Sequence, residues 1–262
     1  MSKTNHTFVI CAYKESPYLE ECIQSLQAQT VSSQILMVTS TPNEWIKKCS
    51  EKYEVPLIIN EGPGGIAQDW NFAYSQCETM YLTIAHQDDI YKKEYTKHLL
   101  QRIKGDELII FPDYGEIREN KHIDKNRNLV IKRIMLWSLR YSWLQKNIWL
   151  RRRILSLGNP ICCPGVLYNK KSLPDKVFNV HFRSNVDWEA WEMLSKKKGR
   201  FVYVPQILME HRIHNDSETS ATIHDNLRTK EDCEMFEKFW PSGIAEKLAK
   251  FYAKSEQSNE IQ

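Results

Sequence analysis

Short apolar runs alternate with amphipathic segments over the first hundred residues. The runs have the length and composition of buried strands, and they lie at 8–12, 35–38, 57–59, 80–85 and 108–111. The segments between them have polar starts or helical spacing and are predicted helices, at 16–27, 40–53 and 64–77 and from Asp89 or Tyr91 onward. Strict alternation of strand and helix predicts an α/β fold with a mostly parallel sheet covered by helices on both faces.

The pattern changes after Asp113. Residues 114–128 are polar and loop-like, and 129–157 mix apolar and basic residues at helical spacing. Beyond a break at Gly158 we predict strands at 161–168 and 201–204 and helices at 187–197 and 225–252. We therefore divide the chain into a first half at 1–113, a helical insertion at 114–158, a second half at 159–217, and a C-terminal helix and tail at 218–262.

Polar residues follow directly after several of the predicted strands. Parallel sheets bind ligands beyond the carboxyl ends of their strands. The site is therefore expected at the turns 12–15, 39–41, 60–65 and 86–89.

Composition narrows the class of protein. The 262 residues are 42% hydrophobic and 26% charged, as in a globular protein. No run approaches the ~20 apolar residues that span a bilayer, and the first residues do not resemble a targeting segment. Seven cysteines without a Cys-x-x-Cys pair favour neither a disulfide framework nor a zinc site. These features predict a cytoplasmic protein.

The net charge of +3 is unevenly distributed. Residues 125–174 contain 11 Lys and Arg and no Asp or Glu, so the rest of the chain is net acidic. The stretch 129–157, with Trp137, Trp143 and Trp149, fits a helix lying on an anionic membrane or a lid over an acceptor site. A packed helix pair with a solvated basic face is the alternative. No nucleic-acid-binding module surrounds the stretch, so no nucleic acid partner is expected.

The turn His86-Gln87-Asp88-Asp89 follows a buried strand directly. Two adjacent carboxylates at such a place are costly unless a positive charge lies between them. Mn²⁺ or Mg²⁺ would meet that need and would neutralise a substrate diphosphate. Alternatively, Asp89 caps the next helix and Asp88 faces water.

At this turn the chain resembles a family 2 glycosyltransferase with the GT-A fold, a Rossmann-like sheet flanked by helices. The resemblance covers 7–115 and 160–217. It is carried by the first strand and turn (9–15), the Leu26-Gln27-Ala28-Gln29 helix end, the acidic turn, an acidic helix start and a His/Arg segment.

The resemblance assigns candidate roles residue by residue. Asp88, with its neighbour Asp89, matches the metal-binding acid. The nucleotide contacts would come from the turns and the third helix, namely from Ala12, Tyr13, Glu15, Ser40, Gly65, Asn71, His86, Gln87 and Arg212. Two positions depart from the family. His86 replaces an Asp that contacts the ribose, and Thr39-Ser40-Thr41 replaces a segment whose Asp contacts the base. Tyr13 has the alternative of a wedge in the core.

Asp187 resembles the family's general base, which takes the proton of the acceptor hydroxyl in an inverting transfer. It also fits an ordinary residue of a helix N-terminus. The neighbouring Trp188 and Trp191 fit core packing better than stacking on a sugar.

His211 to Ser217 resembles the family's closing segment. On an extended stretch Arg212 and His214 face one way and His211 the other. Arg212 and His214 would then meet the diphosphate, with His214 as a metal ligand. Each has the alternative of a solvated or core polar group.

The loop Gly62 to Ala67 supports a rival function. Its Gly-x-Gly-x-x-Ala spacing after a strand and before a helix also fits a dinucleotide-binding oxidoreductase that uses NAD(P). Against this, the loop follows the third strand, and Pro63 removes one backbone donor.

The sequence thus predicts a metal-dependent transferase of cell-surface polysaccharide or glycoconjugate synthesis. It would move a sugar from a nucleotide-sugar donor, with UDP as the expected nucleotide, to a glycan or lipid-linked acceptor. Contact of 129–157 with the inner face of a membrane is expected. Besides the oxidoreductase, a non-catalytic carbohydrate- or membrane-binding protein on the same fold stays open.

Overall fold

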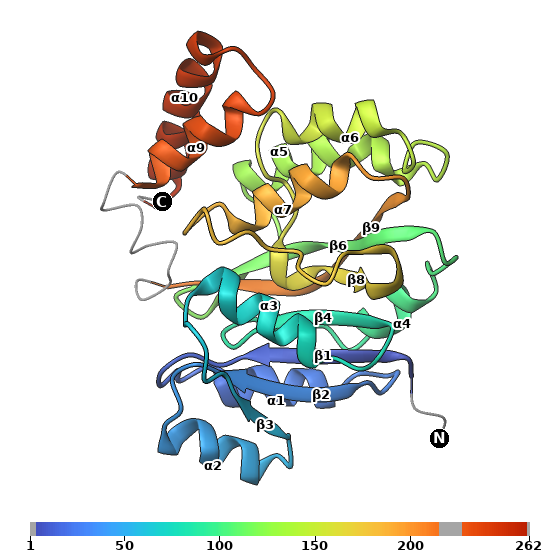
Figure 1. Ribbon diagram of the computed structural model, residues 1–262, viewed down its shortest axis with the longest axis vertical. Coiled ribbons are helices and arrows are strands. Elements are labelled where there is room, and N and C mark those ends of the chain that lie inside the picture. Colours follow the sequence, from blue (N-terminus) through green and yellow to red (C-terminus); the bar gives the residue numbers. More distant parts are fainter. Residues whose placement is uncertain (1–3, 215–226, 261–262) are drawn as a thin grey trace.

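The computed structural model describes residues 4–214 and 227–260, with side chains up to 253. Within these residues one nine-stranded sheet forms the centre of the molecule (Figure 1). Its strand order is β3-β2-β1-β4-β8-β6-β9-β5, and β7 pairs with β6. The strands are β1 (His6–Cys11), β2 (Gln34–Thr39), β3 (Leu57–Ile59), β4 (Tyr81–His86), β5 (Ile90–Tyr91), β6 (Glu107–Arg118), β7 (Lys121–Ile123), β8 (Leu167–Asn169) and β9 (Arg200–Ile213).

The first four strands are all parallel, as the alternating pattern predicts. β1 lies between β2 and β4, and its residues are buried almost throughout. Cys11 is in register with both Val38 and His86, so the chain leaves these three strands at the same edge of the sheet. The turns that carry the candidate residues therefore meet there.

The other half of the sheet mixes both directions. β8 runs antiparallel to β4 and β6, whereas β6 and β9 are parallel. Their pairing extends from Glu107 opposite Arg200 to Arg118 opposite Ile213. β5 is antiparallel to β9, so residues 90–91 are strand where a helix was one expectation. The prediction of a loop at 114–128 is wrong for its first part. β6 continues to Arg118 and turns through Glu119 and Asn120, both with positive φ, into β7.

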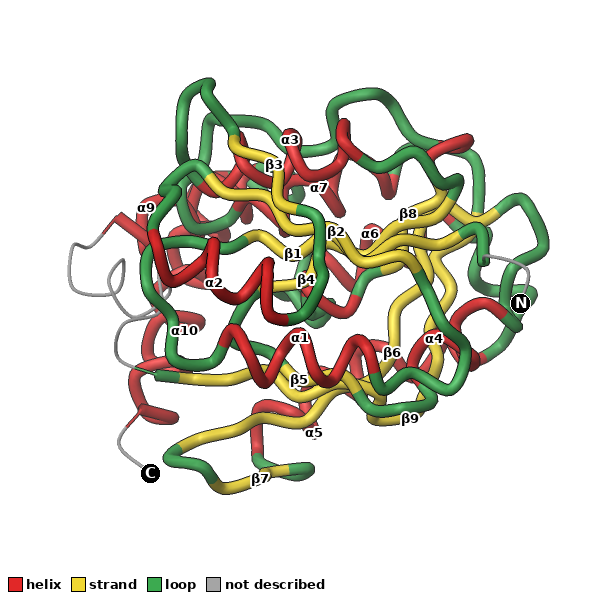
Figure 2. Tube along the Cα trace, turned by 90° about the horizontal axis from the view of Figure 1, so that it is seen from below, coloured by secondary structure: helices red, strands yellow, loops and turns green. Residues whose placement is uncertain are grey.

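Helices cover both faces of the sheet (Figure 2). α1 (Leu19–Gln27) and α4 (Tyr95–Leu100) lie on one face, and α3 (Ile66–Gln76) and α7 (Val186–Ser195) lie on the other. Two hydrophobic clusters, one for each face, form the core. α2 (Glu44–Lys52) begins after Asn43, whose side chain accepts a hydrogen bond from the amide of Ile46. The four predicted helices of the first half are present, with later starts.

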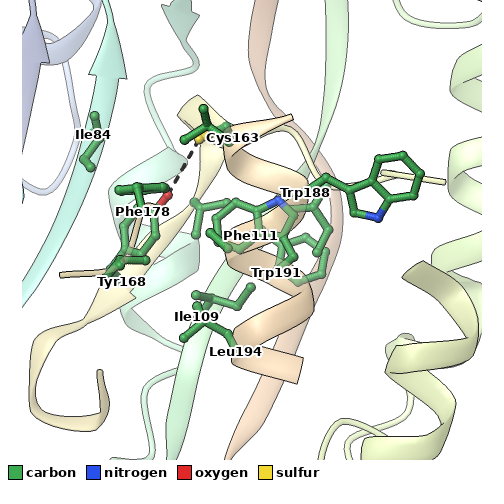
Figure 3. Packing of buried hydrophobic residues seen from close by; sticks show 14 of the residues in the cluster. Ile84, Ile109, Phe111, Cys163, Tyr168, Phe178, Trp188, Trp191 and Leu194 are labelled. Atoms are coloured by element: carbon green, nitrogen blue, oxygen red, sulfur yellow. Dashed lines mark hydrogen bonds between the residues drawn. The ribbon is translucent and has the colours of Figure 1, made fainter. Parts of the chain in front are cut away.

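Trp188 and Trp191 both lie in the core, as the packing interpretation expected (Figure 3). Both are 0% exposed, and the Trp191 ring stacks on Tyr168. Trp188 donates from its indole to the carbonyl of Leu155. α7 is thereby fixed against the sheet, and its first turn carries Asp187.

The basic segment forms α5 (Arg127–Leu136), a 3₁₀ turn (Trp137–Arg140) and α6 (Ile148–Leu155). Three of its cations form ion pairs with acids of the fold, and two more donate to neutral oxygens. The cations and their partners are Arg133 with Asp113, Lys146 with Asp106, Arg152 with Glu192, Lys132 with the Tyr114 hydroxyl, and Arg151 with three backbone carbonyls. Part of the basic composition is therefore used for contacts within the fold.

The C-terminal region contains two helices where one was predicted at 225–252. α9 (Leu227–Glu237) and α10 (Ser242–Glu260) are separated by a short segment that ends at Pro241. Because proline has no amide hydrogen to donate, it does not continue a helix. Residues 215–226, including the end of the predicted closing segment and the start of the predicted helix, lie outside the described residues. Among the helices that the structure describes, none has the length and apolar character needed to cross a bilayer.

Candidate functional site

The turns after β1 and β4 are joined by the side chain of Gln87. Its Oε1 accepts a 2.9 Å hydrogen bond from the amide of Tyr13, and its Nε2 donates at 2.9 Å to the carbonyl of Tyr13. The amide of Lys14 in turn donates to Thr41 Oγ1 at the end of β2. Gln87 is thus a support of the first turn. Ala12 is buried beneath that turn, whereas Tyr13 and Glu15 are exposed on it, so Tyr13 is no core wedge.

His86, Asp88 and Asp89 form a compact group at the carboxyl end of β4. One ligand atom from each lies within 4.8 Å of the others. Asp89 is 0% exposed, yet its Oδ2 has no hydrogen-bond partner, and Nε2 of His86 is also buried without one. A buried acceptor without a partner is unfavourable, so this corner is built to receive something positive.

Residues at the end of β9 bind the carboxylates of Asp88 and Asp89. The amide of Arg212 and Nδ1 of His211 each lie 2.9 Å from Oδ1 of Asp89. Nε2 of His214 lies 2.9 Å from Oδ2 of Asp88. Alternation predicted that His211 faces away from Arg212 and His214, yet all three residues contact the acidic turn at the end of the strand. His211 is a site residue that sequence reasoning missed.

These contacts shift the ionisation of the corner. Burial alone would raise the pKa of Asp88, but the hydrogen bond from His214 and the nearby His86 and His211 lower it below its usual value. Burial would lower the pKa of His211, but Asp89 raises it to about 9. Burial lowers the pKa of His86 against the opposing charges of Asp89, Asp88 and Asp187. The lowered pKa favours the neutral imidazole near pH 7.

Arg212 uses its side chain to brace the protein. Its Nε donates to the carbonyl of Asp88 at 3.0 Å, and its guanidinium pairs with Glu21 at 2.5 Å. The guanidinium also lies over the ring of Tyr18, 4.2 Å from the centroid. At 4% exposure, the residue fixes the backbone of the acidic turn. The predicted diphosphate contact of Arg212 gains no support from these contacts.

α3 supports the corner from a second direction. The Trp70 ring stacks on that of His86 at 5.1 Å between centroids. Next to Trp70, the side chain of Asn71 donates from Nδ2 to the carbonyl of Phe178. Its Oδ1 accepts hydrogen bonds from the backbone amides of Val177 and Phe178. Asn71 therefore anchors the loop before α7, and this use leaves its predicted nucleotide contact without support.

Asp69 ties the ends of β2 and β3 to the start of α3. Its carboxylate accepts hydrogen bonds from the hydroxyl of Ser40 and the amide of Asn60, both at 2.8 Å, and a longer one from the amide of Gly65. Gly65 has φ +137°, a conformation that favours glycine. The predicted residues Ser40 and Gly65 thus share the carboxylate of Asp69.

Asp187 lies in the first turn of α7, where the helix dipole favours a carboxylate. Its Oδ2 accepts a 2.7 Å hydrogen bond from Asn159, and its Oδ1 accepts one from the amide of Trp188. Burial raises the pKa of Asp187 despite these two donors. Its charge raises the pKa of His86, as the smallest of the effects that oppose burial there.

Sequence reasoning missed the residues that support the site from a distance. Asn159 stands before Pro160 and reads as a loop residue, and Trp70 reads as part of a helix. Lys132 reads as one of many cations in the basic segment, yet its charge acts on Asp187. None of these has a local signal, because their partners lie far away in the chain.

The donor set suits a hard or borderline divalent cation. Asp88 and Asp89 offer carboxylate oxygens and His86 offers an imidazole nitrogen, whereas the predicted ligand His214 lies outside this group and contacts Asp88 through Nε2. The unpartnered Oδ2 of Asp89 is the observation that decides the fit, because a cation would satisfy it.

Comparison with solved structures gives relatives of the same fold at low identity. TarS 1-349 of S. aureus in complex with UDP-GlcNAc has a TM-score of 0.63 and 14% identity, over 93% of this chain and 70% of that one. The mannosyltransferase PcManGT from Pyrobaculum calidifontis, in complex with GDP-Man and Mn²⁺, has a TM-score of 0.60 and 11% identity, over 96% and 69%. Glucosyl-3-phosphoglycerate synthase from Mycobacterium tuberculosis, with Mn²⁺, UDP and glucosyl-3-phosphoglycerate, has a TM-score of 0.56 and 12% identity, over 81% and 73%.

The likeness confirms the predicted GT-A fold. No curated protein matches the chain. The family model for glycosyl transferase family 2 matches residues 7–176, well over half of the sequence. The protein therefore belongs to glycosyl transferase family 2.

Proposed function

We propose that the protein transfers a sugar from a nucleoside-diphosphate sugar, with UDP as the nucleotide, to a hydroxyl of a glycan or lipid-linked acceptor. The single observation that carries this proposal is the acidic corner at the end of β4. There a buried carboxylate oxygen and a buried imidazole nitrogen lack partners beside a second carboxylate. The complexes of relatives with UDP-GlcNAc and with GDP-Man and Mn²⁺ support the same class of donor.

Asp88 and Asp89 would hold Mn²⁺ or Mg²⁺, with His214 beside Asp88. The cation, when bound, neutralises charge on the leaving diphosphate. The protein's own part is to keep both carboxylates in place. His211 and the amide of Arg212 fix Asp89, and the Arg212 guanidinium fixes the backbone of Asp88.

Asp187 would act as the general base. The acceptor oxygen attacks the anomeric carbon, the bond from that carbon to the diphosphate breaks, and the hydroxyl proton passes to the Asp187 carboxylate. This course inverts the anomeric centre. Asn159 and the Trp188 amide hold the carboxylate through one hydrogen bond on each oxygen, so each oxygen keeps a lone pair for the proton.

Two alternatives are judged on the structure. Family membership and the sheet order speak against the NAD(P)-dependent oxidoreductase, because the glycine loop follows β3, an edge strand, and not a central one. The non-catalytic carbohydrate-binding protein keeps the fold and the corner. It differs only in showing no donor turnover.

We also propose that the protein acts at the inner face of a membrane, in polysaccharide or glycoconjugate synthesis. The internal pairing of Arg133, Lys146 and Arg152 removes much of the charge that would attract anionic lipid. The highly exposed indoles of Trp143 and Trp149 are the features that still favour such a contact.

Thermal-shift measurements with nucleotide sugars, with and without Mn²⁺, test the proposal together with assays of donor turnover. We expect stabilisation that requires both components, and UDP release that depends on metal. Asp88→Asn should abolish both, and the exposed Asp175→Asn should change neither. Stabilisation without any turnover, across a panel of acceptors, would favour the non-catalytic alternative.

A further inference from the structure

The position of His86 raises a question that the proposed function leaves open. In the family an Asp at this position contacts the ribose, so His86 could replace that contact or serve another purpose. Its ring lies with the two carboxylates, with a ligand atom from each residue inside a 4.8 Å group. Ligand atoms on opposite sides of an ion of Mg²⁺ size are about 4.2 Å apart, so the group is close to chelating geometry.

Two unpartnered atoms distinguish the possibilities. Nε2 of His86 and Oδ2 of Asp89 are both buried, and neither has a hydrogen-bond partner. A ribose hydroxyl would satisfy both only with the Nε2–H tautomer of His86, by accepting from Nε2 and donating to Oδ2, whereas a cation accepts electron pairs from an imidazole and a carboxylate together. The ring is also held in place, because Trp70 stacks on it and Phe178 packs edge-on against Trp70. A ring fixed in this way is pre-organised as a ligand.

We propose that His86 is a third protein ligand of the metal and that it makes the corner select Mn²⁺ and later transition metals over Mg²⁺. The inference rests on the proposed metal-dependent transfer and adds to it the identity of the cation. Its chemical reason is that imidazole suits transition metals, whereas Mg²⁺ prefers oxygen ligands alone.

Mn²⁺ titration followed by electron paramagnetic resonance, with Mg²⁺ as competitor and without nucleotide, tests the selectivity. We expect His86→Gln to weaken Mn²⁺ binding about tenfold or more, and Mg²⁺ binding much less. His86→Asp supplies a carboxylate and should lower the ratio of Mn²⁺ to Mg²⁺ affinity about tenfold. His181→Gln is the matched control, because that side chain is exposed and pairs with Glu234; it should leave both affinities unchanged.

Pulsed resonance on the Mn²⁺-loaded protein tests the ligand directly, through the coupling of the metal to ¹⁴N. The His214→Asn variant removes the neighbouring imidazole as a source of that signal. We expect the coupling to persist in His214→Asn and to vanish when His86→Gln is added. Should His86→Gln fail to fold, judged by its thermal melt, His86→Asp takes its place in the double variant.

Persistence of the ¹⁴N coupling in the double variant, or an equal loss of Mn²⁺ and Mg²⁺ affinity in His86→Gln, would overturn the inference. A lower UDP affinity without metal, at unchanged Mn²⁺ affinity, would return His86 to a ribose contact. Because none of these measurements involves acceptor or turnover of a donor, their outcomes are separate from the proposed transfer. A protein that binds Mn²⁺ through His86 but turns over no donor would contradict only the transfer.

Discussion

Asn159 donates a 2.7 Å hydrogen bond to Oδ2 of Asp187, across 28 residues of sequence. The bond links the loop before β8 to the first turn of α7 and fixes the plane of the proposed base. It also favours the charged form of Asp187, against the burial that raises the pKa of that carboxyl.

Replacement of Asp187 by Asn should remove proton transfer and leave the fold intact, because the amide oxygen can keep the bond from Asn159 and only the bond from the Trp188 amide is lost. We expect kcat to fall ~10²–10⁴-fold, as for a positioned general base. Donor binding, measured by thermal shift with Mn²⁺, should be unchanged. Near-full transfer by a folded Asp187→Asn protein would exclude this residue as the base.

As the pH is lowered, transfer activity should be lost at a higher pH than the pKa of an ordinary Asp would give. The carboxylate is the active form, and burial raises its pKa, so activity is full above that raised value and is lost as the pH falls through it. The pH dependence of kcat with saturating donor measures this limb. A limb at or below about 3.9, the pKa of a free Asp, would contradict the assignment.

Asn159→Leu should move the same limb to higher pH. It removes a donor that lowers the pKa of Asp187, so the proton is held more tightly and activity begins to fall earlier on acidification. We also expect a drop in kcat of about tenfold from the loss of orientation. A lower kcat with an unmoved limb would mean that Asn159 supports only the backbone.

Arg151→Met should destabilise the protein by about 3 kcal/mol. The guanidinium is 1% exposed and donates to the carbonyls of Ser195, Lys197 and Gly199, just beyond the end of α7. Its removal leaves these acceptors buried without donors. Urea unfolding provides the measurement.

Arg153→Met is the matched control for that experiment. Arg153 is exposed, and its guanidinium lies over the rings of Trp149 and Trp240. These cation–π contacts at an exposed site are worth about 1 kcal/mol or less. Equal losses in the two variants would show that the three carbonyls find other donors.

The first half of the fold was predictable because its signals are local. The apolar runs that form β1, β2 and β4 are recognisable in the sequence by themselves. The polar turns after them indicate the edge of the sheet where the candidate residues lie. β6 was predicted too short, since Asp113, Gly115 and Glu116 read as a loop although they are buried in a strand. Only pairing with β9, which lies more than eighty residues later, reveals that strand.

The candidate site divides in the same way. Asp88, Asp89 and Asp187 could be chosen from short motifs, whereas the partners that set their ionisation could not. The alternation rule separated His211 from Arg212 and His214, but an edge position where the strand ends lets all three reach the acidic turn. Ser40, Asn71 and Arg212 hold other parts of the protein, and no sequence pattern distinguishes holding a loop from holding a nucleotide.

The pairing of the acidic turn with β9 has a consequence for synthesis. The contacts of Asp89 with His211 and of Asp88 with His214 join residues 122 and 126 positions apart. At roughly 5–20 residues per second, the ribosome adds the second member of each pair about 6–25 s after the first. A half-made chain therefore carries the acids without the histidines that hold them, and the proposed cation site is complete only after His214 has been added.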